Sequence, residues 1–145
     1  QVTAGGVTIT GVHVAHDEKG GSERGKNTII IIDDGDIRLV HLGDLGHVLD
    51  DTTVKALGRV DVLLVPVGGF FTIDHKQAGQ VVEALNPRVV IPMHYKTELV
   101  DFPIAKVDDF LAAQPKVERK NSPTVELTQA TLPSERLVMV LPHAR

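Results

Sequence analysis

Short apolar runs rich in β-branched residues recur along this chain of 145 residues, and turn-forming residues follow each run. Residues 28–32 contain four consecutive isoleucines, which predict a strand covered on both faces. Residues 7–14 alternate apolar with small or polar side chains and predict another strand. Residues 33–36, in which Gly35 can adopt a positive φ, predict a hairpin turn into a returning strand at 37–40. We therefore expect a β-sheet to organise the fold.

From residue 37 onward, strands and helices are predicted to alternate, which is typical of α/β folds. Polar side chains at residues 50–51 and 72–74 can cap two helices, which Gly58 and residues 86–87 would end. Pro103 suits the first turn of a third helix that ends before Pro115. Further strands are predicted at residues 60–65, 89–91, near 117, 124–127 and 137–141. The second helix has a predicted apolar face of Ala78, Val81, Val82 and Leu85. We expect one α/β domain over residues 1–145.

Three of the predicted strands are followed by a histidine or an aspartate, residue types that commonly bind metal ions. His16 follows the strand at 7–14, Asp44 lies on a glycine-flanked turn after 37–40, and His94 follows 89–91. Open α/β sheets bind ligands at the carboxyl ends of their strands, so these side chains predict a metal site. The chain has no cysteine, and a metal must therefore take nitrogen and oxygen ligands. Taken singly, His16 also fits a surface loop, His94 also fits a hydrogen-bonded core residue, and Asp44 also fits a turn cap.

Two more histidines flank Asp44. His41 and His47 each lie three residues away from it in the sequence. We interpret both as outer partners that orient a metal ligand through a hydrogen bond, a role that suits His41 better than direct metal binding.

Two short segments predict substrate contacts. Phe70 and Phe71 lie on the glycine-rich loop after the strand at 60–65 and are predicted to wall a pocket near the metal. Tyr95 and Lys96 follow His94 and supply a hydroxyl and a cation. This set of side chains predicts a small-molecule substrate and is suited to an anionic one.

The net charge, the length of the apolar runs and the absence of two motifs argue against several other classes of function. A net charge of −4 without a basic stripe argues against nucleic acid as a partner. No apolar run is long enough to span a bilayer, which argues against a membrane segment. Neither G-x-x-x-x-G-K-[ST] nor G-x-G-x-x-G occurs, so a nucleotide-binding α/β domain ranks last among the interpretations. A cytoplasmic location and a homo-oligomeric state are both compatible with this composition.

Four motifs occur in an order that resembles one protein family. They are His16-Asp17 before a glycine-rich loop, HLGDLG at residues 41–46, PVGGFFTID at residues 66–74 and IPMHY at residues 91–95. Their order resembles the metallo-β-lactamase-fold hydrolases, in particular the branch similar to ascorbate-6-phosphate lactonase and other Zn-dependent hydrolases of this fold. The resemblance extends to about Thr97. It implies an αβ/βα sandwich of two similar halves, with a two-metal site along one edge.

The resemblance also implies roles for individual residues. His16 would bind one divalent ion, His94 the other, and Asp44 would bridge both and so take part in catalysis. Zn²⁺ suits such ligands, and Mn²⁺ or Fe²⁺ suits them too. The family's main metal motif, His-x-His-x-Asp-His, should precede His16 and is absent. Because the chain also begins with Gln1 and opens directly into a strand, we expect a sandwich that is incomplete at its N-terminus and inactive by itself.

Two functions from different classes remain open at this stage. The first is a metal-dependent hydrolase in which a metal-activated water attacks an ester, lactone or phosphoester-type substrate. The second is a non-catalytic binding or scaffold domain of the same fold whose metal site is incomplete. The coding sequence upstream of Gln1 distinguishes them, because it either contains the missing metal motif or lacks it.

Overall fold

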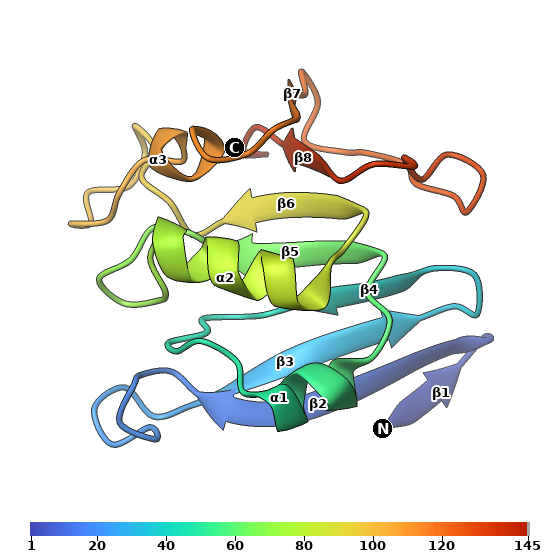
Figure 1. Cartoon of the computed structure of the whole chain (residues 1–145), viewed down its shortest axis with the longest axis horizontal. Helices are drawn as coiled ribbons and strands as arrows, with labels where there is room; N and C mark the ends of the chain where they lie inside the picture. The colour runs from blue at the N-terminus through green and yellow to red at the C-terminus, as the bar shows by residue number, and fades with distance from the viewer. Residues whose placement is uncertain (145) are drawn as a thin grey trace.

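A single mixed β-sheet organises the chain (Figure 1). The structure is a computed structural model and describes residues 1–144. Within them, eight strands lie in the order β1-β2-β3-β4-β5-β6-β8-β7. The elements in chain order are β1 (Val2–Ala4), β2 (Val7–Ala15), β3 (Lys26–Asp33), β4 (Arg38–His41), α1 (Asp51–Leu57), β5 (Val62–Pro66), α2 (His75–Leu85), β6 (Val89–Met93), α3 (Asp108–Leu111), β7 (Val117–Arg119) and β8 (Leu137–Val140).

The first half of the sheet is antiparallel and is built from hairpins. The β3–β4 pair has the predicted turn, in which the Asp34 carboxylate accepts the backbone N–H groups of Asp36 and Ile37. Gly35 lies in this turn with φ 94°. Strand β1 is an additional element that pairs with β2 through a turn at Gly5 and Gly6, both with positive φ.

The second half of the sheet is parallel. Strands β4, β5 and β6 are parallel neighbours, and β8 and β7 continue the same direction. Helices α1 and α2 connect the first three of these strands, as predicted from the alternating pattern. The carboxyl ends of the parallel strands therefore meet at one edge of the sheet, on the left in Figure 1.

Helices α1 and α2 begin and end where local sequence signals predict. Asp50 caps α1 by accepting the Thr53 N–H, and Gly58 ends it with φ 64°. Asp74 caps α2 in a capping box with Gln77, and Asn86 ends it in the left-handed conformation.

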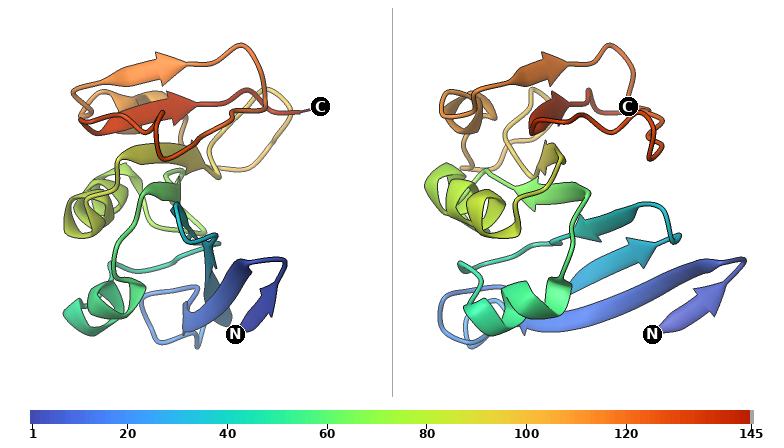
Figure 2. Two further views of the ribbon diagram at one scale, coloured as in Figure 1. Left: turned by 90° about the vertical axis from the view of Figure 1, so that its right-hand side faces the viewer. Right: turned by 45° about the vertical axis from the view of Figure 1, so that its right-hand side comes forward.

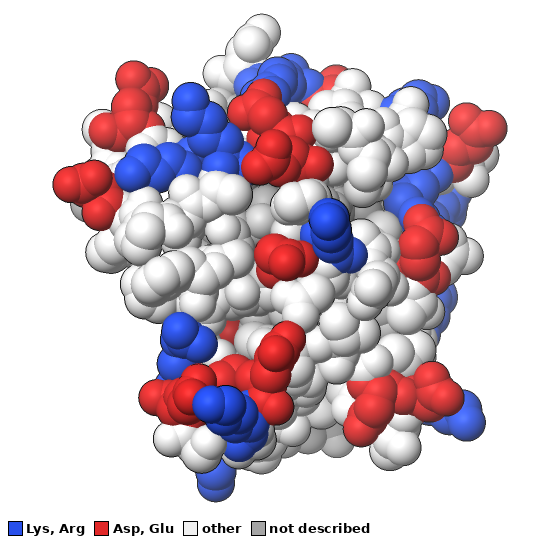
Figure 3. Space-filling view, turned by 60° about the vertical axis from the view of Figure 1, so that its left-hand side comes forward, with Lys and Arg blue, Asp and Glu red and all other residues white. Residues whose placement is uncertain are grey.

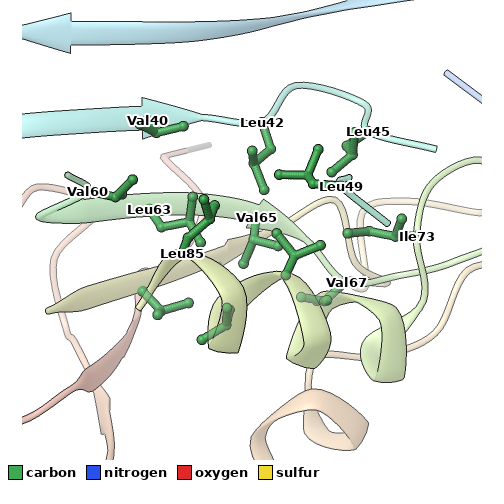
Figure 4. Close-up of a cluster of buried hydrophobic side chains, with 14 of the residues drawn as sticks. Val40, Leu42, Leu45, Leu49, Val60, Leu63, Val65, Val67, Ile73 and Leu85 are labelled. Atoms are coloured by element: carbon green, nitrogen blue, oxygen red, sulfur yellow. The ribbon is translucent and has the colours of Figure 1, made fainter. Parts of the chain in front are cut away.

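The principal core lies between the helices and one face of the sheet. Figure 2 shows α1 and α2 on the same side of the strands. The predicted apolar face of α2 is buried, and Figure 4 shows the neighbouring side chains of β4, β5 and the loop after β4 pointing toward it. Val40, Leu42, Leu45, Leu63, Val65, Val67 and Ile73 are fully buried there.

The second face of the sheet is apolar and only partly covered. The register aligns Ile9, Ile32 and Leu39 across three strands, and Val62 follows in the same row. Val62 belongs to a smaller buried cluster near β8, but Ile9 and Ile32 remain 44% and 37% exposed. The expectation that residues 28–32 are covered on both faces is therefore wrong within residues 1–144, because the helices cover only the other face.

Two other expectations at the C-terminal end are also wrong. Residues 124–127 form no strand, although Val125 and Leu127 still pack on the second face of the sheet. The third helix does not start at Pro103 but covers only Asp108–Leu111. The backbone of Ala105 instead joins two loops, because its N–H donates to Gly68 O and its carbonyl accepts the Lys96 N–H. Within the described part of the chain, no helix has both the length and the apolar character needed to cross a membrane.

Candidate metal centre

The structure brings His16, Asp44 and His94 together at the carboxyl-end edge of the sheet. His16 follows β2, Asp44 lies three residues after β4, and His94 directly follows β6. His16 Nε2 is 3.3 Å from Asp44 Oδ2, and His94 Nε2 is 4.0 Å from Asp44 Oδ1. Each imidazole therefore faces a different oxygen of one carboxylate. The exposed fractions of the three side chains, 20%, 52% and 28% in this order, leave the group open to solvent.

These donor atoms fit a divalent metal. Ligand atoms about 2.1 Å from Zn²⁺ lie roughly 3.4 Å apart at a tetrahedral angle, close to the 3.3 Å between His16 and Asp44. The separation between His94 and Asp44 is wider, at 4.0 Å. The Nδ1 atoms of His16 and His94 are buried and have no hydrogen-bond partner among residues 1–144. Within the same residues, no three His, Asp or Glu side chains converge enough to hold one ion together. The geometry thus resembles two half-sites that share a carboxylate.

Asn27 at the start of β3 fixes the turn that carries Asp44. Its Oδ1 accepts the Asp44 N–H at 3.1 Å, and its Nδ2 donates to Leu42 O at 2.8 Å. No local sequence signal indicates this role, because Asn27 and Asp44 are 17 residues apart. His41 acts within the same turn, since its Nδ1 accepts the Gly43 N–H at 3.0 Å. The predicted partner His41 therefore supports the backbone next to Asp44.

Gly46 and His47 hold the backbone beside His16. A Cβ atom on Gly46 would lie 2.1 Å from the carbonyl carbon of His16, so only glycine permits this approach. His47 Nε2 accepts the Ala15 N–H at 3.3 Å, and its Nδ1 lies 2.9 Å from Val48 O. His47 thus contacts the residue before His16, and its Nδ1 carries the proton when both bonds form.

Asp17 organises the glycine-rich loop after His16. Its buried carboxylate accepts four backbone N–H groups, from Lys19, Gly21, Glu23 and Arg24, at 2.7–3.0 Å. The bond from Arg24 is the largest of the effects that lower the pKa of Asp17 from 3.8 to about 2, while burial opposes them. The loop is closed by a further bond from His16 N–H to Gly25 O.

The backbone is strained at His94 and at Phe70. Both adopt left-handed conformations, with φ 53° and 63°, which side chains with a Cβ rarely adopt. Gly68 packs against His94, because a Cβ at this position would lie 2.2 Å from His94 O. Strained residues persist where the surrounding structure fixes them, and they often cluster at functional sites.

The residues predicted to contact substrate divide into two places. Phe70 and Phe71 line a cavity of about 260 Å³ that also reaches Gly46. Tyr95 lines a different cavity, its hydroxyl lies 3.5 Å from Leu141 O, and burial raises its pKa. Lys96 Nζ donates to Phe102 O and lies 3.6 Å from Asp101. Figure 3, in which this edge comes forward, shows charged side chains around a mostly uncharged surface.

The chain is thus an α/β domain with helices on one face of its sheet and three candidate metal ligands at the carboxyl ends of its strands. Comparison with known families narrows this class. Residues 1–94 match the beta-lactamase superfamily domain, and the chain belongs to this family.

Solved structures agree with this assignment. A proposed Zn-dependent hydrolase of the metallo-β-lactamase superfamily from Thermotoga maritima is 43% identical, with a TM-score of 0.84 over 97% of this chain and 67% of its own. A metallo hydrolase from Ignicoccus hospitalis is 31% identical, with a TM-score of 0.56 over 72% of this chain and 43% of its own. The predicted metallo-β-lactamase-like α/β fold is therefore confirmed.

Curated relatives are similar over a shorter stretch. A UPF0173 metal-dependent hydrolase from Hyperthermus butylicus is 39% identical over 87 residues, which cover 60% of this chain and 36% of the relative. The chain spans about a third of the length of curated relatives that it matches.

Proposed function

We propose that this chain carries part of the active site of a metal-dependent hydrolase. One observation carries the proposal, namely that the Asp44 carboxylate presents one oxygen to His16 and the other to His94. The names of relatives as metal-dependent hydrolases support the same function.

The family resemblance implies roles for the three side chains, and this geometry supports them. His16 would hold one divalent ion, His94 a second, and Asp44 both, with Zn²⁺, Mn²⁺ or Fe²⁺ compatible with these ligands. Such ions, when bound, lower the pKa of a coordinated water and polarise the bond under attack. Asn27 and His41 hold the Asp44 turn, and Gly46 and His47 hold the His16 backbone. We propose an ester, lactone or phosphoester as the substrate, as in the branch similar to ascorbate-6-phosphate lactonase.

Three ligands are too few for two ions. We propose that the other ligands come from a segment outside these 145 residues, and that the chain alone is inactive. The partly uncovered apolar face of the sheet supports this proposal. Exposed apolar patches often mark surfaces that another protein segment covers. The 145 residues alone should therefore bind metal weakly, since their ligands are divided between two ions.

A direct test measures metal content and hydrolysis in the longest natural protein that contains this chain. Asp44→Ala should remove most bound metal and lower hydrolysis of ester and phosphodiester test substrates by at least about a hundredfold. Glu126→Ala, which removes a carboxylate from an exposed loop, is the matched control and should retain both. Full metal content and activity in Asp44→Ala would refute the assignment.

A non-catalytic domain of the same fold is the competing proposal. It is favoured by the finding that no three potential ligands within residues 1–144 converge on one ion. The same experiment separates the two functions, because a scaffold domain would contain no stoichiometric metal in the longest natural protein.

A further inference from the structure

We propose that Arg24 binds an oxyanion of the substrate, a carboxylate or a phosphate, in the cavity lined by Phe70 and Phe71. This inference rests on the proposed hydrolase function and adds a specificity-determining residue to it.

The cavity lies next to the candidate metal centre. Its volume is about 260 Å³, and its walls come from the loop after His16, the loop after β5 and the first turn of α2. Gly46 forms part of the wall and packs directly against the His16 backbone. A molecule in this cavity would therefore lie beside the segment that carries His16.

Arg24 is held in place at both its backbone and its side chain. Its N–H donates to the buried Asp17 carboxylate at 2.7 Å, which fixes the loop at this residue. Its guanidinium carbon lies 6.0 Å from the centre of the Phe71 ring, within the range of a cation–π interaction. Phe71 in turn packs edge-to-face on Phe70 and Phe102, at 4.7 and 5.8 Å between ring centres. The stack orients the guanidinium before any ligand arrives.

The other charged groups of the cavity are already engaged. Lys19 forms an ion pair with Glu23, and Glu18 accepts a hydrogen bond from Gln77. Asp74 accepts the Gln77 N–H as the cap of α2.

Arg24 differs from these groups. Within residues 1–144, its guanidinium forms no ion pair or hydrogen bond, so its fork of donors is available for a bidentate contact with an oxyanion. Lys96, the cation expected from sequence for this role, instead contacts Asp101 and Phe102 O. The structure thus favours Arg24 over Lys96 as the anion-binding residue.

Titration of the metal-free form of the longest natural protein that contains this chain tests this inference. Benzoate and phenyl phosphate serve as anionic probes, benzyl alcohol serves as a neutral probe of similar shape, and chemical shifts in ¹H–¹⁵N NMR spectra give the affinities. Arg24→Gln should weaken binding of both anions by about tenfold or more, because a charge-assisted bidentate contact is lost. Arg24→Lys should cause a smaller loss, since the charge remains without the planar fork. Phe71→Leu should weaken binding a few-fold through the lost stacking.

Lys55→Gln is the matched control, because it removes one exposed positive charge from α1, away from the cavity. It should change the affinities by less than about twofold. The inference is overturned if Arg24→Gln binds the anions as the unaltered chain does, if Lys55→Gln loses as much affinity, or if benzyl alcohol binds as tightly. The probe that binds more tightly, phenyl phosphate or benzoate, shows whether the cavity prefers a phosphate or a carboxylate. Metal titration of the longest natural protein tests the hydrolase function separately, so the two proposals can fail independently.

Discussion

At the scale of single residues, Asp17 shows how one carboxylate can shape a binding loop. Four backbone N–H groups converge on it from residues 19–24, and they include the N–H of Arg24. A loop with three glycines would otherwise be free to adopt many conformations. Asp17 therefore links the local fold after His16 to the position of the proposed anion-binding side chain.

Asp17 also predicts a dependence of stability on pH. The pKa of the Asp17 carboxyl is about 2 in the folded chain, whereas an aspartate exposed to water has a pKa of 3.8. Because the folded value is lower, the carboxylate stabilises the fold above pH 4, and this contribution disappears as the pH falls from about 4 toward 2. Asp17→Asn should therefore lower the urea midpoint at pH 7 and flatten its change between pH 4 and 2. Asp109→Asn, in an exposed position on α3, is the control. An unchanged pH profile in Asp17→Asn would contradict the role of this carboxylate.

At the scale of elements, two glycines offer opposite predictions. Gly46 packs against His16, where a Cβ would lie 2.1 Å from a backbone carbon, whereas Gly79 lies within α2 with nothing inside 4 Å. Gly46→Ala should lower the free energy of unfolding by about 1–3 kcal/mol, because the loop must move away. Gly79→Ala should raise it by about 0.5–1 kcal/mol, because alanine favours helix. Chemical unfolding of both variants measures the difference. Equal effects would contradict the close contact between Gly46 and the His16 backbone.

The helices and loops also show what the sequence can predict. The bounds of α2 followed from its cap, its apolar face and Asn86, all of which are local signals. Residues 103–107 followed no local rule, because Ala105 pairs with two other loops instead of forming a helix. Strand ends predicted that His16, Asp44 and His94 would lie close together, and the structure places them so. The contributions of Asn27 and Arg24 depend on contacts across folded loops, and no spacing in the sequence indicates them.

At the scale of the whole molecule, the two faces of the sheet differ in what covers them. Helices α1, α2 and α3 contribute buried side chains to the core on one face. The other face has a cavity of about 300 Å³ with mainly apolar walls, among them Ile32 and Leu39. The run of isoleucines in β3 serves both faces, since successive side chains of a strand point in opposite directions. Adjacent residues of β3 therefore lie in different surroundings, one in the principal core and the next on the partly exposed second face.

A pair of matched substitutions tests this difference. Ile31 is 2% exposed in the principal core, and its neighbour Ile32 is 37% exposed on the second face. Ile31→Thr should lower the free energy of unfolding by about 2–4 kcal/mol, because it leaves a cavity and buries a hydroxyl. Ile32→Thr should lower it by about 1 kcal/mol or less, because threonine keeps the β-branched shape at a position open to water. Urea unfolding gives both values, and sedimentation at the same concentrations gives the mass. An equal loss in the two variants, together with a dimeric mass, would show that a second copy covers this face in solution. An equal loss in a monomer would contradict the exposure of Ile32 on the second face.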